Sequence, residues 1–139
     1  MARARILLAD DHKEMRDRVV RMLEAEFDVL GAVEDGGALL EAALKINPDV
    51  CVIDISMPIL SGIEAAAQLK ESGSTAKVIF LTVHDDPDFV QAALETGALG
   101  YVVKARMASD LRAAIKGAMA GRLFISPSGT SGLPLEQNE

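Results

Sequence analysis

The segment VCVIDISMP, residues 50–58, is an apolar run that ends in a single carboxylate, Asp54, and is stopped by Pro58. A β-branched run without charges predicts a strand that is buried on both faces, as at the centre of a parallel sheet. Ligands of open α/β sheets bind outside the carboxyl ends of the strands, so Asp54 is predicted at the binding edge. An Asp after a strand is also a common turn or helix-capping residue. When the segment is considered alone, this structural role competes with a binding role for Asp54.

Apolar segments alternate with amphipathic ones along the rest of the chain. Apolar residues at three- and four-residue spacings predict helices, and the last helix is expected to begin at the Ser109-Asp110 pair. Strands are predicted over residues 3–9, 29–33, 50–54, 77–83 and 99–103, and helices over 13–27, 36–46, 62–71, 87–96 and 109–121. This alternation predicts an α/β fold in three layers, with a parallel sheet between helices. In the common strand order 2-1-3-4-5, the switch point falls between the first and third strands.

Composition limits the classes of function. The chain has 139 residues, of which half are hydrophobic, so we expect one domain with a full core. The net charge of −7 argues against direct nucleic-acid binding. A single cysteine, Cys51, inside an apolar run indicates a reducing compartment, and the N-terminal apolar run is too short to span a membrane. We therefore expect a cytoplasmic protein, with residues 127–139 as a flexible tail or linker stub.

Polar side chains follow several of the predicted strands. Asp10 and Asp11 end the first strand, Thr82 lies near the end of the fourth, and Lys104 ends the fifth. Together with Asp54 they would share one edge of the sheet. Clustered carboxylates raise one another's pKa unless a cation offsets the repulsion, and Mg²⁺ prefers carboxylates together with water and phosphate oxygens. The pattern predicts a Mg²⁺ site where an Asp carboxylate attacks phosphorus and a lysine neutralises the transferred group.

These residues resemble the receiver domain of two-component response regulators, and the resemblance covers roughly residues 3–126. The motifs that carry it are Asp10-Asp11, the DISMP turn of residues 54–58 followed by Gly62, and then Thr82, Tyr101 and Lys104. The resemblance implies a flavodoxin-like (βα)5 fold and a receiver domain over residues 1–126.

The resemblance also implies the metal and phosphorylation chemistry of the site. In that family, the position of Asp54 accepts a phosphoryl group from a sensor histidine kinase. The magnesium ion is held at the positions of Asp11, Asp54 and the backbone carbonyl of Ser56, and the position of Asp10 assists.

A conformational switch is implied as well. The hydroxyl at the position of Thr82 moves toward the phosphoryl group, which Lys104 also stabilises, and the aromatic ring at Tyr101 rotates inward. The partner-binding face of the fourth helix, fifth strand and fifth helix changes in response. Ser56 and His84 each lie two residues after a site residue and are candidates for setting the lifetime of the phosphoryl group.

The residues around Lys104 point to a subfamily. Many receivers have a proline after this lysine, usually with a cis bond, whereas Ala105 follows here and predicts a trans bond. This feature and the segment GRLFISP, residues 121–127, most resemble receivers of the NarL/LuxR-type subfamily, which carry a helix-turn-helix output. The residues after Pro127 are too few for three DNA-binding helices, so we expect either a stand-alone receiver or the receiver part of a LuxR-type transcriptional regulator.

Two other functions compete with phosphoryl signalling. Phosphohydrolases resembling haloacid dehalogenases place a second carboxylate two residues after the nucleophile, where this chain has Ser56, so we expect phosphoryl acceptance and slow self-dephosphorylation but no turnover. An unphosphorylated interaction module usually lacks an acidic residue or the lysine, and this chain keeps all of them. The expected partners are a sensor histidine kinase, an output domain or protein, and a second copy on phosphorylation.

Overall fold

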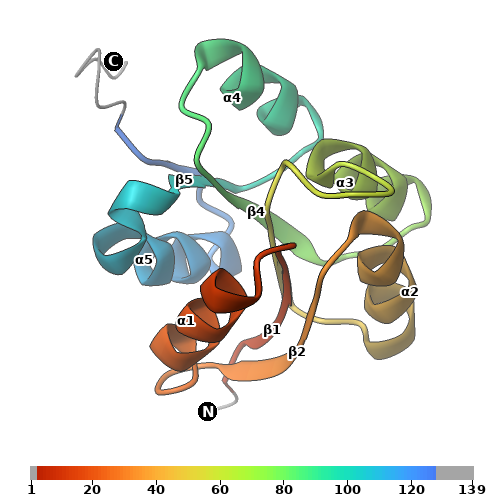
Figure 1. Cartoon of the computed structure of the whole chain (residues 1–139), viewed down its shortest axis with the longest axis horizontal. Helices are drawn as coiled ribbons and strands as arrows, with labels where there is room; N and C mark the ends of the chain where they lie inside the picture. Colours follow the sequence, from red (N-terminus) through yellow and green to blue (C-terminus); the bar gives the residue numbers. More distant parts are fainter. Residues whose placement is uncertain (1–2, 128–139) are drawn as a thin grey trace.

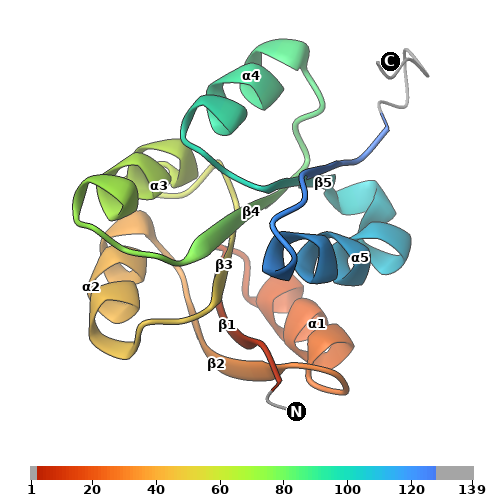
Figure 2. The same ribbon diagram turned by 180° about the vertical axis from the view of Figure 1, so that it is seen from behind.

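Parallel strands form the central layer of the molecule, with helices on both faces (Figure 1, Figure 2). The computed structural model describes residues 3–127. The sheet has the order β2-β1-β3-β4-β5-β6, which confirms the predicted order of the first five strands. The strands are β1 (Arg5–Ala9), β2 (Asp28–Val33), β3 (Val50–Ile53), β4 (Lys77–Thr82), β5 (Gly100–Val103) and β6 (Phe124–Ile125).

The helices divide between the two faces of the sheet, as Figures 1 and 2 show from opposite sides. Helices α1 and α5 cover one face, and α2, α3 and α4 cover the other. Their bounds are α1 (Lys13–Leu23), α2 (Gly36–Ile46), α3 (Gly62–Glu71), α4 (Pro87–Glu95) and α5 (Met107–Met119), with a short 3₁₀ turn, η1 (Lys104–Arg106), before α5. No helix in the described residues is long and apolar enough to cross a membrane.

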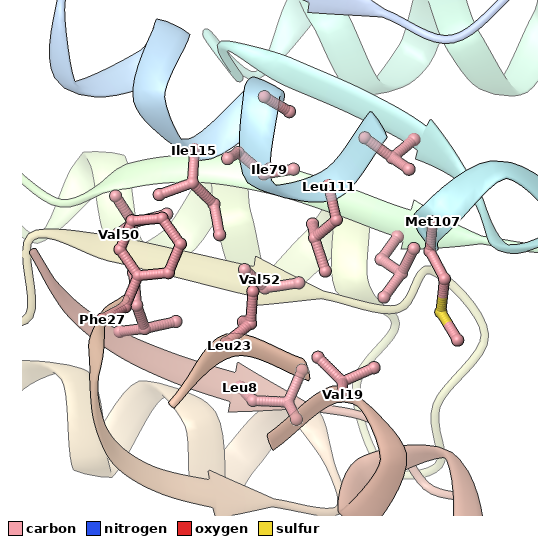
Figure 3. Packing of buried hydrophobic residues seen from close by; sticks show 14 of the residues in the cluster. Leu8, Val19, Leu23, Phe27, Val50, Val52, Ile79, Met107, Leu111 and Ile115 are labelled. Atoms are coloured by element: carbon pink, nitrogen blue, oxygen red, sulfur yellow. The ribbon is translucent and has the colours of Figure 1, made fainter. Parts of the chain in front are cut away.

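Each face of the sheet has its own apolar core. On the first face, Leu23 of α1 and Leu111 of α5 pack over Val52 at the centre of β3 (Figure 3). The β3 side chains are buried on both faces of the sheet, as the run in residues 50–58 predicted. Burial raises the pKa of Cys51 to about 12, so its thiol remains protonated.

The predicted bounds of the first and last helices were wrong. Helix α1 ends at Leu23, and residues 24–26 form a turn in which the backbone N–H of Glu26 donates to the carbonyl of Leu23 at 3.1 Å. Helix α5 begins at Met107, two residues before the Ser109-Asp110 pair. This pair therefore lies within the helix and does not cap it.

Asp110 instead anchors a strand that the sequence did not predict. Its buried carboxylate accepts hydrogen bonds from Arg106 Nε at 2.9 Å, from Ser109 Oγ at 2.9 Å and from Ser126 Oγ at 2.7 Å. Burial alone would raise the pKa of Asp110, but these bonds outweigh it and lower the pKa. Since Ser126 N–H also donates to Tyr101 O at 2.8 Å, the network fastens β6 to both β5 and α5.

The connection from β3 to α3 brings a helix close behind Asp54. The N–H of Gly62 donates to the carbonyl of Ile55 at 2.8 Å, and a Cβ atom at Gly62 would lie only 2.1 Å from the carbonyl oxygen of Asp54. Ser61 caps α3 through a capping box with Glu64. The close approach accordingly requires glycine at this position. All peptide bonds of the described chain are trans, including Lys104–Ala105 as predicted.

Candidate functional site

Two neighbouring strands place Asp10 and Asp54 side by side. Strands β1 and β3 pair in parallel with Ala9 opposite Ile53, so the residue that follows each strand emerges at the same height. The backbone N–H of Asp54 donates to the carbonyl of Ala9 at 2.9 Å, and this bond extends the pairing by one step. The structure thus brings the two carboxylates to the predicted edge of the sheet.

Lys104 joins the two carboxylates. Its ammonium nitrogen lies 2.8 Å from Asp10 Oδ2 and 2.9 Å from Asp54 Oδ2. The side chains of Asp10, Asp54 and Lys104 are only 1%, 5% and 9% exposed, respectively. One ammonium is therefore shared between two buried carboxylates, which leaves a net negative charge in a place of low solvent access.

The pKa shifts follow from this imbalance. Burial raises the pKa of Asp54, and the charge of Asp10 adds to the effect, although hydrogen bonds from Lys104 and Ser56 oppose it. Burial alone would lower the pKa of Lys104, but its hydrogen bonds to the two carboxylates outweigh burial and raise the pKa. The lysine consequently stays charged, and the cluster retains an affinity for a further positive charge.

A divalent cation fits the open side of this cluster. Asp10, Asp11, His12 and Asp54 each offer one ligand atom, and these atoms lie within 4.8 Å of one another. Opposite ligands of an octahedral Mg²⁺ are about 4.2 Å apart, so the three carboxylates of this group have the right chemistry and scale for the ion. His12 was not among the predicted site residues. Its Nδ1 lies 3.1 Å from Asp11 Oδ1, and its only sequence signal was its place after the acidic pair.

Ser56 and His84 contact each other across the mouth of the site. Ser56 Oγ lies 2.8 Å from His84 Nε2, and the backbone N–H of Ser56 donates to Asp54 Oδ1 at 3.3 Å. The imidazole of His84 also stacks on the ring of Phe89, with centroids 4.3 Å apart. The β3–α3 and β4–α4 loops are joined at this point, which spacing in the sequence did not reveal.

Thr82 and Tyr101 connect to the same histidine. Thr82 is fully buried, and its Oγ1 accepts a hydrogen bond from the backbone N–H of His84 at 3.3 Å. The hydroxyl of the buried Tyr101 donates to the carbonyl of His84 at 2.6 Å. Burial raises the pKa of Tyr101, and the charges of Asp85 and Asp86 add to the shift, so the phenol stays protonated and keeps this donor. All the predicted site residues therefore lie within one connected set.

Comparison with known proteins identifies the family. The response regulator receiver domain matches residues 6–116, which is most of the chain. The chain belongs to the response regulator receiver family. A transcriptional regulatory protein, DegU of Brevibacillus brevis, is 40% identical to this receiver over 130 residues, which cover 92% of this chain and 55% of that protein. This receiver thus spans about half the length of that relative.

Solved structures place the receiver in the NarL/LuxR type. A LuxR-family response regulator from Aurantimonas sp. superposes with a TM-score of 0.86 at 33% identity, covering 91% of each chain. The signal receiver domain of the putative response regulator NarL from Mycobacterium tuberculosis superposes with a TM-score of 0.84 at 31% identity, covering 88% of this chain and 100% of that one. Both likenesses confirm the flavodoxin-like receiver fold and a place among the receiver domains of response regulators. Receiver domains of this family generally serve in signalling.

The raised pKa of Asp54 predicts how stability depends on pH. Asp54 takes up a proton at a higher pH in the folded chain than in the unfolded chain. Lowering the pH through the folded pKa therefore raises the free energy of unfolding of the wild type. Asp54→Asn removes the buried charge, so at neutral pH this variant should have the larger free energy of unfolding. The advantage should shrink as the pH falls through the folded pKa of Asp54. Urea unfolding between pH 4 and 8 measures this difference, and a variant less stable than the wild type at neutral pH would contradict it.

Proposed function

We propose that this receiver takes a phosphoryl group onto Asp54 from a sensor histidine kinase. The observation that carries the proposal is the position of Asp54, which is buried at the end of β3 with Lys104 2.9 Å from one of its oxygens and the carboxylates of Asp10 and Asp11 beside it. A carboxylate oxygen of Asp54 attacks phosphorus, the bond from phosphorus to the donor nitrogen breaks, and an acyl phosphate forms. The ammonium of Lys104 then faces the new negative charge.

Magnesium belongs to this proposal because the donor set fits it. Asp10, Asp11, Asp54 and the backbone carbonyl of Ser56 would hold the ion, which supplies charge neutralisation to the phosphoryl oxygens when bound. Lys104 already occupies one oxygen of Asp10 and one of Asp54, so their second oxygens are the ones available to a cation. These second oxygens accept backbone N–H bonds from His12 and Ser56, and Asp10 Oδ1 also lies 3.5 Å from His12 Nδ1.

The hydrogen bonds around His84 support a switch role for Thr82 and Tyr101. A phosphoryl group on Asp54 offers the Thr82 hydroxyl a stronger acceptor, and its movement breaks the 3.3 Å bond from His84 N–H. The His84 carbonyl, which holds the Tyr101 hydroxyl, then changes position. Tyr101 lies on β5, so the change reaches the face formed by α4, β5 and α5.

The Ser56–His84 contact makes a prediction about the lifetime of the acyl phosphate. Ser56→Ala removes the hydrogen bond that joins the two loops over Asp54, and water gains access to the phosphoryl group. We expect loss of the phosphoryl group to become about fivefold faster, which corresponds to one hydrogen bond of about 1 kcal/mol. The decay of the phosphorylated mass after removal of the donor measures this rate. Ser72→Ala is the control, since its hydroxyl donates to Gln68 O; an unchanged or slower decay in Ser56→Ala would refute the role.

The wider biological role rests on the relatives. We place this receiver domain, residues 1–126, in the cytoplasm, either as the receiver part of a LuxR-type regulator or as a stand-alone receiver. It acts on an output domain or a protein partner and forms a homodimer on phosphorylation. DegU of Brevibacillus brevis, by its description a transcriptional regulatory protein, supports transcription as the output. The predicted tail or linker over residues 127–139 lies outside the described residues except for Pro127.

The test is an intact-mass measurement after incubation with acetyl phosphate. We expect one phosphoryl adduct on the wild type, formed only with Mg²⁺, and none on Asp54→Asn. Asp49→Asn, at the opposite end of the same strand, is the matched control and should form the adduct. A wild type without any adduct at early times would favour the unphosphorylated interaction module.

A further inference from the structure

Arg16 reaches back from α1 to the loop that carries the acidic pair. Its Nη1 donates to the backbone carbonyl of Asp10 at 2.8 Å, and its side chain is only 15% exposed. The guanidinium also lies 3.7 Å from the carboxylate of Glu34, which is 71% exposed. A pair with so exposed a carboxylate contributes little, so the backbone carbonyl is the principal partner of Arg16.

The carbonyl that Arg16 holds belongs to the peptide group joining Asp10 to Asp11. On the side of Asp10, the backbone is already fixed, because its N–H donates to Val33 O at 3.0 Å. On the other side, His12 is the N-cap residue of α1 and provides no side-chain cap, while its backbone N–H donates to Asp10 Oδ1 at 2.9 Å. The orientation of this peptide sets the direction in which the Asp11 side chain leaves the backbone, and the bond from Arg16 holds the carbonyl oxygen of the peptide.

The guanidinium of Arg16 also brings a positive charge near the site without contacting the carboxylate oxygens that would bind the cation. Lys104 contacts the carboxylate oxygens themselves, whereas Arg16 contacts a backbone oxygen. Its positive charge therefore offsets part of the repulsion among the carboxylates and leaves their free oxygens available. A group that orients metal ligands from behind commonly changes metal affinity by about 10- to 100-fold when it is removed.

We propose that Arg16 is a positioning residue for the divalent cation, which it serves by fixing the Asp10–Asp11 peptide. This inference rests on the proposed function, since it assumes that the acidic cluster binds the ion. Arg16 is expected to raise the affinity of the site for Mg²⁺ and to have no direct part in the phosphoryl transfer that follows.

The experiment is calorimetric titration of the full chain with MgCl₂, together with adduct formation from acetyl phosphate over a range of Mg²⁺ concentrations. Arg16→Gln should weaken Mg²⁺ binding about tenfold, while the rate at saturating Mg²⁺ stays close to that of the wild type. Arg16→Lys keeps the charge and one donor and should fall between the two. Arg18→Gln removes an equal charge from an exposed position on the same helix and should bind Mg²⁺ like the wild type.

The outcomes separate this inference from the proposed function. Wild type that binds Mg²⁺ and forms the adduct, beside an Arg16→Gln variant with the same affinity, overturns the role of Arg16 alone. A rate deficit in both Arg16 variants that persists at saturating Mg²⁺ overturns it too, because positioning for the ion is then not the function of Arg16. Wild type without Mg²⁺ binding or adduct overturns the proposed function itself. If Arg16→Gln does not fold, the affinity of Arg16→Lys for Mg²⁺ tests the proposal: a value below that of the wild type supports it, and an equal value overturns it.

Discussion

Lys104→Met should both destabilise the folded chain and nearly abolish phosphoryl acceptance. The substitution leaves Asp10 and Asp54 buried beside each other without the ammonium that now lies 2.8 Å and 2.9 Å from them. Breaking a buried pair in this way typically costs about 3–5 kcal/mol of unfolding free energy. Loss of a preorganised charge at the acceptor should also slow adduct formation by about 100-fold or more.

The control for this prediction is a lysine on the surface. Lys116 lies 2.8 Å from Glu26, but the two side chains are 60% and 40% exposed. Lys116→Met should therefore cost less than about 1 kcal/mol. Added Mg²⁺ or a lower pH should restore part of the stability of Lys104→Met, because either one neutralises the negative charge of the two carboxylates that have lost Lys104. Urea unfolding that shows equal losses for the two variants would contradict the account of the cluster.

Gly62→Ala is the second substitution with a large expected effect. Its Cβ would lie 2.1 Å from the Asp54 carbonyl oxygen and 2.9 Å from Ile53 Cγ2, so the start of α3 must move away from the end of β3. Overpacking of this kind costs about 1–3 kcal/mol and sometimes more. Because the displaced backbone is that of Asp54, phosphoryl acceptance should fall together with stability.

Another glycine supplies the matched control. Gly117 lies inside α5, where an added Cβ would meet its nearest atom at an ordinary distance of 3.5 Å. Gly117→Ala should raise the unfolding free energy by about 0.5–1 kcal/mol, since alanine favours the helix. Thermal and urea unfolding measure both variants. A Gly62→Ala variant as stable as the wild type would show that the start of α3 does not constrain Asp54.

The sequence predicted the fold and the centre of the site for one physical reason. The uncharged, β-branched run of β3 favours a buried strand, and parallel strands bring their carboxyl ends to a common edge, so Asp10, Asp54 and Lys104 were expected to meet there. The strand order followed from the same βα alternation and is confirmed. Hydrophobic periodicity and strand order were therefore enough to predict the position of a residue that lies at the end of a predicted strand.

Features that depend on pairing between distant segments were not predicted. Strand β6 has only two residues, Phe124 and Ile125, which is too short for a periodic pattern. Asp110 was expected near a helix start because Asp is a frequent cap, yet its partner Ser126 lies sixteen residues further on. The target of Arg16 is a backbone carbonyl, which no side-chain motif marks.

The identity of the acceptor residue is the central claim, and borohydride reduction tests it most directly. Borohydride converts an acyl phosphate into an alcohol, so the phosphorylated Asp becomes homoserine, which peptide mapping by mass spectrometry locates. After treatment with acetyl phosphate and Mg²⁺, homoserine should appear at residue 54 and only there. Without Mg²⁺ it should be absent. Homoserine at another residue, or none while the intact protein carries the phosphoryl mass, would contradict the assignment of Asp54 as the acceptor.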